Sequence, residues 1–187
     1  MTSGWKVIGS ESFCDFPWLK VAREHVATPT RPDGVPWMVA HRPVAAVVAP
    51  RTPEGSYLLI RQERIPVRRE TWEFPAGQVE GGISEESILA TAHRELGEEA
   101  GVRCPGELVS LGHFYSSVGF TDECCHLFLA PGVVHSADLV DHDEHEAIHE
   151  VRAFAPDELT AAIAEGTIID ANTMAVYARL NARGCYR

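Results

Sequence analysis

The chain has 187 residues, of which 45% are hydrophobic and 23% are charged, so a wholly disordered chain or a fibrous repeat is excluded. Sixteen basic residues stand against 27 acidic ones, which gives a formal net charge of −11. This charge argues against non-specific binding of nucleic acid or of an anionic membrane, because both need a basic surface. An anionic substrate would need cations between itself and such a protein.

The apolar runs and the cysteines lead us to expect a cytoplasmic protein. The longest apolar run, 44–49, is far shorter than the roughly 20 residues that a membrane-spanning helix needs. No basic segment leading into an apolar run is present near residue 1, so no signal peptide is expected. The five cysteines are odd in number and form no Cys-x-x-Cys pair, which indicates reduced thiols rather than a disulfide framework.

Residues 1–44 are expected to form a small antiparallel unit of strands ahead of the main domain. Extended stretches at 18–22 and 37–40 are separated by a turn signal at 30–34, Thr-Arg-Pro-Asp-Gly. The segment is too short to bury a core alone, and it holds three of the four tryptophans. We therefore expect it to pack on a second subunit in a two-fold homodimer.

The main domain, 45–187, alternates strands and helices. Strands are expected at 45–49, 56–61, 108–114, 126–130 and 149–154, and helices at 84–100, at about 156–166 and at 170–182. Ser84 is a suitable N-terminal cap for the first helix, and Gly101 is a suitable C-terminal stop. The pattern predicts an α+β fold with a mixed sheet covered by helices.

Three carboxylates share one face of the first helix. Glu95, Glu98 and Glu99 stand at i, i+3 and i+4. A solvated acidic face is the common explanation for such a set, but the turn at Gly77, ahead of the helix, can direct backbone carbonyls to the same face. An oxygen-rich cluster of this kind suits Mg²⁺, which keeps waters and substrate phosphates among its ligands.

The same helix carries the pattern Glu86-x7-Arg94-Glu95-Leu96-x-Glu98-Glu99-x-Gly101-Val102. We expect Glu86 to pair with Arg94 by charge and place both among the catalytic residues. The pattern resembles the Nudix box, except that eight rather than five residues separate Gly77 from Glu86. The added residues lie in a loop, where extra length costs little. The resemblance implies a Nudix-type α/β/α sandwich with a mixed β-sheet.

Four further segments resemble the ADP-ribose and nucleoside diphosphate sugar pyrophosphatase branch of that family. They are Leu-Ile-Arg-Gln-Glu-Arg at 59–64, Trp-Glu-Phe-Pro-Ala-Gly at 72–77, Ser-Val-Gly-Phe-Thr-Asp-Glu at 117–123 and Gly-Thr-Ile-Ile-Asp-Ala-Asn-Thr at 166–173. One departure is Val118, which stands where that branch has a proline that is taken to mark ADP-ribose specificity. Val118 therefore affects which sugar is accepted more than it affects the type of reaction that the resemblance implies.

The resemblance implies hydrolysis of the pyrophosphate bond of ADP-ribose, or of a related nucleoside diphosphate sugar, to a nucleoside monophosphate and a sugar phosphate. It also implies Mg²⁺ or Mn²⁺ ions, which lower the pKa of a bound water. Their implied ligands are Glu95, Glu98, Glu99 and the carbonyl of Ala76. The implied base lies on the loop 141–146, where we prefer Glu146 over Glu144. A solvated loop without a role is the alternative.

The substrate site implied by the resemblance includes aromatic and basic side chains. Trp18 and Trp37 are candidates to stack on the base, with packing in a core or an interface as the equal alternative. Arg61 and Arg64 can clamp phosphate or ribose, with surface ion pairing as the alternative. The remaining substrate-binding candidates in the matching segments are Glu73, Gly119 and Glu123.

Two other functions stay open. His145-Glu146-Ala147-Ile148-His149 spells His-Glu-x-x-His, which binds zinc in proteases when it lies on a helix. Here the segment leads into an expected strand, which argues against a protease. The second alternative is a Nudix domain that only senses a nucleotide, but such domains usually lose the box carboxylates, which are present here.

Overall fold

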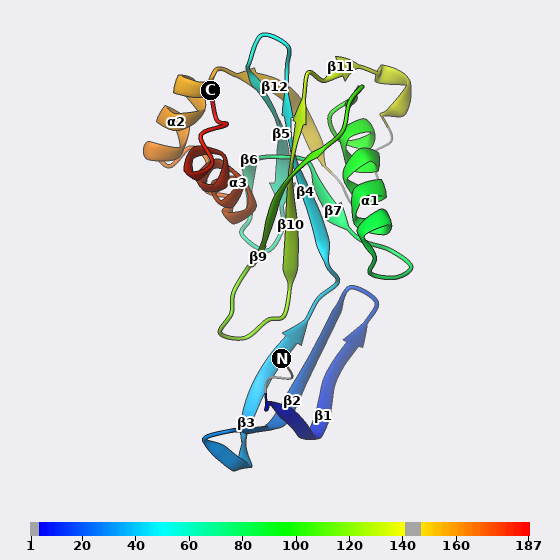
Figure 1. Ribbon diagram of the computed structural model, residues 1–187, viewed down its shortest axis with the longest axis vertical. Helices are drawn as coiled ribbons and strands as arrows, with labels where there is room; N and C mark the ends of the chain where they lie inside the picture. The colour runs from blue at the N-terminus through cyan, green and yellow to red at the C-terminus, as the bar shows by residue number, and fades with distance from the viewer. Residues whose placement is uncertain (1–3, 141–146) are drawn as a thin grey trace. The chain divides into compact units, whose positions relative to one another are not determined.

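The computed structural model describes residues 4–140 and 147–187. These residues form two compact units (Figure 1). The first unit contains the residues up to Pro43 and the segment Tyr115–Cys124, and the second contains Val44–Phe114 and Cys125–Arg187. No helix among the described residues is long and apolar enough to cross a membrane.

The first unit is built on a three-stranded antiparallel sheet in the order β1-β2-β3. The strands are β1 (Lys6–Phe16), β2 (Leu19–Thr28) and β3 (Arg31–His41). The turn expected at 30–34 is misplaced, because the chain turns at 29–30 and residues 31–34 already belong to β3. The pairing of β2 with β3 shifts register between Val26 and Thr28, and Gly34 takes a positive φ of 82° there. A bulge of this kind accommodates turn-type residues inside a strand.

The second unit is built on a seven-stranded mixed sheet, with its central strands in the order β12-β5-β4-β10-β9, while β6 pairs with β5 and β7 pairs with β4. The strands are β4 (Ala45–Arg51), β5 (Tyr57–Arg64), β6 (Arg69–Glu73), β7 (Ala76–Gln78), β9 (Val109–Tyr115), β10 (Cys124–Pro131) and β12 (Ile148–Phe154). The smaller elements are β8 (Val102–Arg103), β11 (Val134–His135) and the 3₁₀ helix η1 (Ala137–Leu139). Strand β4 runs parallel to β10 and antiparallel to β5, so the expected mixed sheet is confirmed.

Helix α1 (Glu85–Glu98) covers one face of this sheet, and α2 (Pro156–Ala164) and α3 (Ala171–Ala182) cover the other (Figure 1). Alternate residues of β4 supply the two cores. Ala46 and Val48 pack with the apolar stripe of α1, whereas Val47 and Ala49 pack with side chains of α2 and α3. The fold is therefore α+β, with the expected α/β/α sandwich.

Helix α1 begins where the sequence predicts it. The hydroxyl of Ser84 accepts a hydrogen bond from the backbone N–H of Ser87 at 3.0 Å, and Ser87 Oγ accepts one from the backbone N–H of Ser84 at 2.9 Å. This reciprocal pair is a capping box, which satisfies two backbone donors at the start of the helix. It fixes the start of the helix that presents the acidic residues.

Candidate active site

The carboxylates of α1 lie beside the segment that leads into β7. Glu95 and Glu99 are each 2% exposed, and Glu98 is partly exposed. Glu99 Oε2 accepts a hydrogen bond at 2.8 Å from the backbone N–H of Ala76, 23 residues away in the chain. The structure thus brings together two of the four residues that the resemblance implies as metal ligands, Glu99 and Ala76.

Arg94 is held by two of these carboxylates. Its Nη2 lies 2.5 Å from Glu95 Oε1, and its Nη1 donates to Glu98. Burial lowers the pKa of Arg94, but Glu95 and Glu98 outweigh burial and raise that pKa above its usual value. The expected pairing of Arg94 with Glu86 is wrong, because Arg94 uses its two Nη atoms to hold Glu98 and Glu95. Glu86 instead lies exposed in the first turn.

Gly77 lies directly against Glu95. A Cβ atom built on Gly77 would overlap the Glu95 carboxylate. Because glycine has no side chain, the buried Glu95 carboxylate can lie close to the backbone of β7.

A second charged group surrounds Glu73, which is 3% exposed. Arg64 donates from Nε to Glu73 Oε1 at 2.9 Å and from Nη2 to Glu73 Oε2 at 2.5 Å, and the Thr71 hydroxyl also donates to Glu73. Burial lowers the pKa of Arg64, but Glu73 together with the more distant Glu99 and Asp170 raises it above its usual value. Glu73 therefore positions Arg64, whose Nη1 has no hydrogen-bond partner among the described residues.

Sequence reasoning did not select the residues that tie the C-terminal helix to this group. Asp170 caps α3, because its Oδ2 accepts from the backbone N–H of Thr173 at 2.7 Å and from the Thr173 hydroxyl at 2.8 Å. Thr173 Oγ1 in turn accepts from the backbone N–H of Phe74 at 3.0 Å, 99 residues away. The only signal for this contact was the resemblance of residues 166–173 to a family motif.

Replacing Asp170 by asparagine is expected to change how stability depends on pH. Burial raises the pKa of Asp170 and Glu73 raises it further, against the hydrogen bonds of Thr173. The folded state therefore holds the proton more tightly than the unfolded state, whose Asp pKa is about 3.9. Stability falls as the pH rises from the unfolded pKa through the folded pKa.

The asparagine side chain keeps an oxygen that can cap α3, so Asp170→Asn should abolish this fall without unfolding the protein. Urea unfolding at a series of pH values from about 4 to 8 measures the free energy of unfolding of the wild type and of the variant. If the difference in unfolding free energy between variant and wild type is the same at every pH, the assignment to Asp170 is wrong.

Three predicted substrate residues lie in the first unit. Trp37 Nε1 donates to the carbonyl of Gly119 at 2.8 Å, and Glu123 accepts from Ser116 Oγ at 2.6 Å and pairs with Arg42 Nε at 2.7 Å. These contacts join β3 to the segment Tyr115–Cys124, as does the hydrogen bond from Ala40 N–H to the Phe120 carbonyl. Trp37 and Gly119 are therefore in contact, and Glu123 lies in the same segment as Gly119 but bonds to other residues.

Trp18 lies in the turn before β2 and not in a strand. Trp18 and Trp37 are 58% and 55% exposed, so neither packs in a core of this chain. Stacking on a base and packing on a second subunit remain as explanations for both side chains.

Arg61 and Arg64 project from opposite faces of β5, because successive side chains of a strand alternate. Arg61 Nη1 lies 2.6 Å from Glu70 Oε2, and its Nε lies 3.2 Å from Glu150 Oε2. Arg61 thus joins β6 and β12 through surface ion pairs. The structure does not bring Arg61 and Arg64 together as a clamp.

The loop 141–146, with the predicted base Glu146 and its alternative Glu144, lies outside the described residues. His149 falls within β12, so the helix that a His-Glu-x-x-His zinc site requires is not formed over residues 148–154. This strand argues against the zinc protease.

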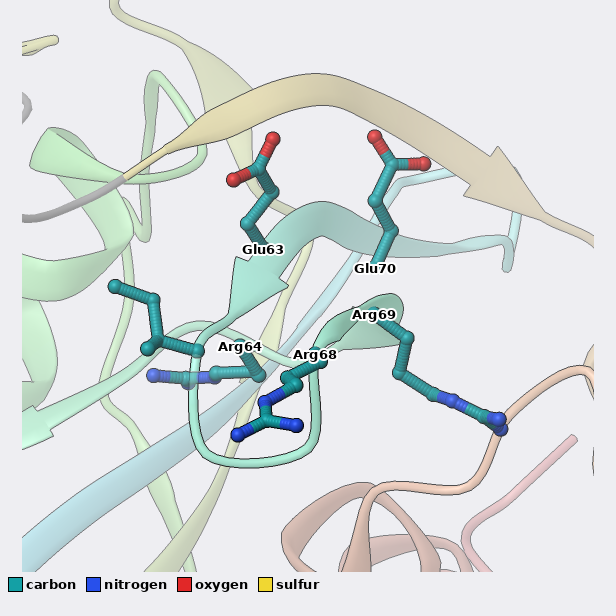
Figure 2. A pocket seen from close by; sticks show the side chains of 6 residues that line it. Glu63, Arg64, Arg68, Arg69 and Glu70 are labelled. Carbon is teal, nitrogen blue, oxygen red and sulfur yellow. The ribbon is translucent and has the colours of Figure 1, made fainter.

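A pocket of about 380 Å³ lies at the turn between β5 and β6 (Figure 2). We call it the hairpin pocket. It is lined by Glu63, Arg64, Ile65, Arg68, Arg69 and Glu70. Arg64 belongs both to this pocket and to the group around Glu73.

The α1 carboxylates fit a divalent cation. Glu95 and Glu99 place two buried carboxylates beside Ala76 and Gly77, and Arg94 and the Ala76 N–H orient them. A set of carboxylate and carbonyl oxygens suits Mg²⁺ or Mn²⁺. The ligands would be Glu95, Glu98, Glu99 and the Ala76 carbonyl.

Known proteins resemble this chain in sequence or in fold. A curated ADP-ribose pyrophosphatase of Bacillus subtilis (strain 168) is 37% identical over 115 residues, which span 60% of each chain. The methanol dehydrogenase activator of Bacillus methanolicus is 31% identical over 169 residues, 90% of this chain and 88% of its own. The crystal structure of an ADP compounds hydrolase has the same fold, with a TM-score of 0.75, 16% identity, and coverage of 97% of this chain and 96% of its own.

The family model of the NUDIX domain matches residues 40–177, which include the acidic helix, the turn at Gly119 and the Asp170 cap. The resemblance seen in the sequence is thus confirmed, and this chain belongs to the Nudix family.

Proposed function

We propose that this Nudix pyrophosphohydrolase cleaves the pyrophosphate bond of ADP-ribose or of a related nucleoside diphosphate sugar. The products are a nucleoside monophosphate and a sugar phosphate. The observation that carries the proposal is the buried pair Glu95 and Glu99, which contacts Ala76 and Gly77 in strand β7, where the sequence predicted a turn. The ADP-ribose pyrophosphatase activity of the Bacillus subtilis relative supports the substrate class.

The chain's own residues have distinct roles in this proposal. A bound Mg²⁺ or Mn²⁺ neutralises phosphate charge and lowers the pKa of a bound water. Arg94 orients Glu95 and Glu98, and the Ala76 N–H orients Glu99. Arg64, which is fixed by Glu73, is our candidate among the arginines for contact with the substrate.

Glu146 remains our candidate for the general base, with Glu144 as the alternative. Either carboxylate would accept a proton from the attacking water, a role that requires hydrogen-bond reach to that water. The ordering of the two rests on the family resemblance.

The test of the proposal is a panel of nucleoside diphosphate sugars assayed with Mg²⁺ and with Mn²⁺. Val118 is 85% exposed at the start of a turn in which the N–H groups of Phe120 and Thr121 donate to the Ser117 carbonyl. Proline at this position would fix φ and remove the backbone N–H. Valine leaves φ free and keeps the N–H as a donor. We therefore expect a broad enzyme that hydrolyses ADP-ribose and also ADP-glucose.

The measured quantity is the ratio of kcat/KM values, which reports differential binding of the transition states. A preference for ADP-ribose above about a thousandfold, roughly 4 kcal/mol, would contradict the argument from Val118. Val118→Pro should raise the ratio. Failure to hydrolyse any member of the panel with either metal would contradict the enzyme and favour a nucleotide sensor.

We also propose that the first unit mediates a homodimer. Large apolar side chains are exposed along its strands and turns, namely Trp5, Phe13, Phe16, Trp18 and Trp37. An exposed apolar set of this size marks an interaction surface, and a two-fold dimer is the commonest way to cover one.

Light scattering is therefore expected to give twice the chain mass of 20.5 kDa. Phe13→Ser should shift the equilibrium toward the monomer, whereas Val109→Ser, an exposed change on the second unit, should not. A monomeric mass for the wild type at assay concentration would refute the dimer.

A further inference from the structure

The hairpin pocket has its acidic and basic side chains on different sides of the β5–β6 hairpin. Figure 2 shows Glu63 and Glu70 pointing toward β12, while Arg64 and Arg68 project from the side of the turn. Glu63 Oε1 lies 3.1 Å from His149 Nε2, and Glu70 pairs with Arg61. Both carboxylates are therefore engaged by partners outside the pocket.

The arginines of the turn lack such partners. Among the described residues, Arg68 and Arg69 make no side-chain hydrogen bond and no ion pair, and Arg64 uses only Nε and Nη2 to hold Glu73. In a chain of net charge −11, this turn places the guanidinium groups of Arg64 and Arg68 together in one pocket, whereas the Arg69 side chain points away from them (Figure 2). Its unpaired donors are complementary to an anion.

The backbone of Arg68 supports a role for its side chain. Arg68 has a φ of 56° and is the one non-glycine residue with positive φ in the described part of the chain. This conformation is strained for an L-residue, whereas glycine adopts it freely. The turn is closed by a hydrogen bond of 2.8 Å from the Arg68 N–H to the Arg64 carbonyl. Non-glycine residues held in such strained conformations cluster at functional sites.

We propose that the hairpin pocket binds a phosphate group, with Arg68 as its principal cation and with Arg64 Nη1 as a further donor. Guanidinium groups bind phosphate oxygens through paired, charge-assisted hydrogen bonds. The site includes Arg64 but none of the α1 carboxylates, and it requires no metal. Its ligand is either a free phosphate ion or a phosphate carried on the sugar of the substrate, and the second source rests on the proposed function.

The first experiment titrates the full chain with inorganic phosphate in metal-free buffer and follows the arginine side-chain signals by NMR. We expect a Kd of about a millimolar for the wild type. Arg68→Gly should raise this Kd at least tenfold, and Arg68→Lys should raise it less. Arg103→Ala removes an exposed positive charge from β8 and should leave the Kd unchanged.

Arg68→Gly is a suitable variant because glycine relieves the backbone strain, so its urea midpoint should equal or exceed that of the wild type. The proposal is overturned if phosphate binds equally well to the wild type and to Arg68→Gly. It is also overturned if the wild type does not bind phosphate, or if Arg103→Ala weakens binding as much as Arg68→Gly does.

The second experiment distinguishes the two sources of the phosphate. It compares kcat/KM for ADP-ribose with kcat/KM for ADP-ribose phosphorylated on its terminal ribose, in the wild type and in Arg68→Gly. A preference for the phosphorylated substrate that disappears in Arg68→Gly assigns the pocket to the substrate. If the ratio of the two kcat/KM values is the same in the wild type and in Arg68→Gly, and phosphate binding still depends on Arg68, the hairpin pocket is assigned to the free ion. If neither compound is hydrolysed, the proposed function fails, while the titration still decides the pocket.

Discussion

Glu99→Gln is expected to lower kcat at saturating Mg²⁺ by at least about a thousandfold, roughly 4 kcal/mol of activation free energy. Glutamine has the size of glutamate and keeps an oxygen that can accept the hydrogen bond of the Ala76 N–H. The fold should therefore be retained. What the variant lacks is one formal negative charge at a site where Glu99 is 2% exposed and where solvent screens little.

Glu85→Gln is the matched control for this variant. Glu85 lies on the same helix but in its exposed first turn, where its contribution is limited to a favourable interaction with the helix dipole. The control should turn over substrate like the wild type. Mn²⁺ binding, measured by electron paramagnetic resonance, should weaken in Glu99→Gln alone. Near-normal turnover of Glu99→Gln at saturating Mg²⁺ would exclude Glu99 from the metal site.

The features predicted well from the sequence are those specified by neighbouring residues. The start of α1 follows from Ser84 and the apolar stripe that comes after it, and both signals lie within a few turns of helix. The shared face of Glu95, Glu98 and Glu99 follows from helical spacing alone. The buried strand β4 follows from its apolar run between two prolines.

Features that depend on distant contacts were not predictable in this way. The bonds that hold the site together join Ala76 to Glu99 and Phe74 to Thr173, across 23 and 99 residues. No local pattern specifies such pairs, and only the family motifs hinted at them. Among the described residues, Arg94 likewise donates to its near neighbours on the helix, Glu95 and Glu98, and not to the more distant Glu86.

Strand alternation would have separated two residues that the sequence analysis grouped. Arg61 and Arg64 are three positions apart, so in a strand they project to opposite faces. The two arginines suggested one clamp. On one face of the strand, however, Arg61 pairs with Glu70 and Glu150, and on the other face Arg64 pairs with Glu73. A sequence motif identifies candidate residues, but only those that lie on the same face of the strand can contact one ligand.

Gly77→Ala is expected to lower kcat about a hundredfold, because displacing a catalytic group by about 1 Å has an effect of this order. The added methyl group would overlap the Glu95 carboxylate. Glu95 is buried and is held by Arg94, so it cannot move aside without breaking that contact. Gly77 has no positive φ, so alanine meets no backbone strain there and the effect is steric. Overpacking of this kind also costs about 1–3 kcal/mol of stability.

Gly82→Ala separates the steric effect at Glu95 from a general effect of alanine in the loop that leads to α1. A Cβ atom at position 82 meets no atom within 4 Å, and Gly82 also has no positive φ. This control should keep the wild-type kcat and the wild-type affinity for Mn²⁺, whereas Gly77→Ala should lose affinity for Mn²⁺ along with kcat. If Gly77→Ala retains both while its unfolding free energy falls, Glu95 has been displaced without consequence for catalysis. The buried carboxylate would then stabilise the turn at β7 and would not be a metal ligand.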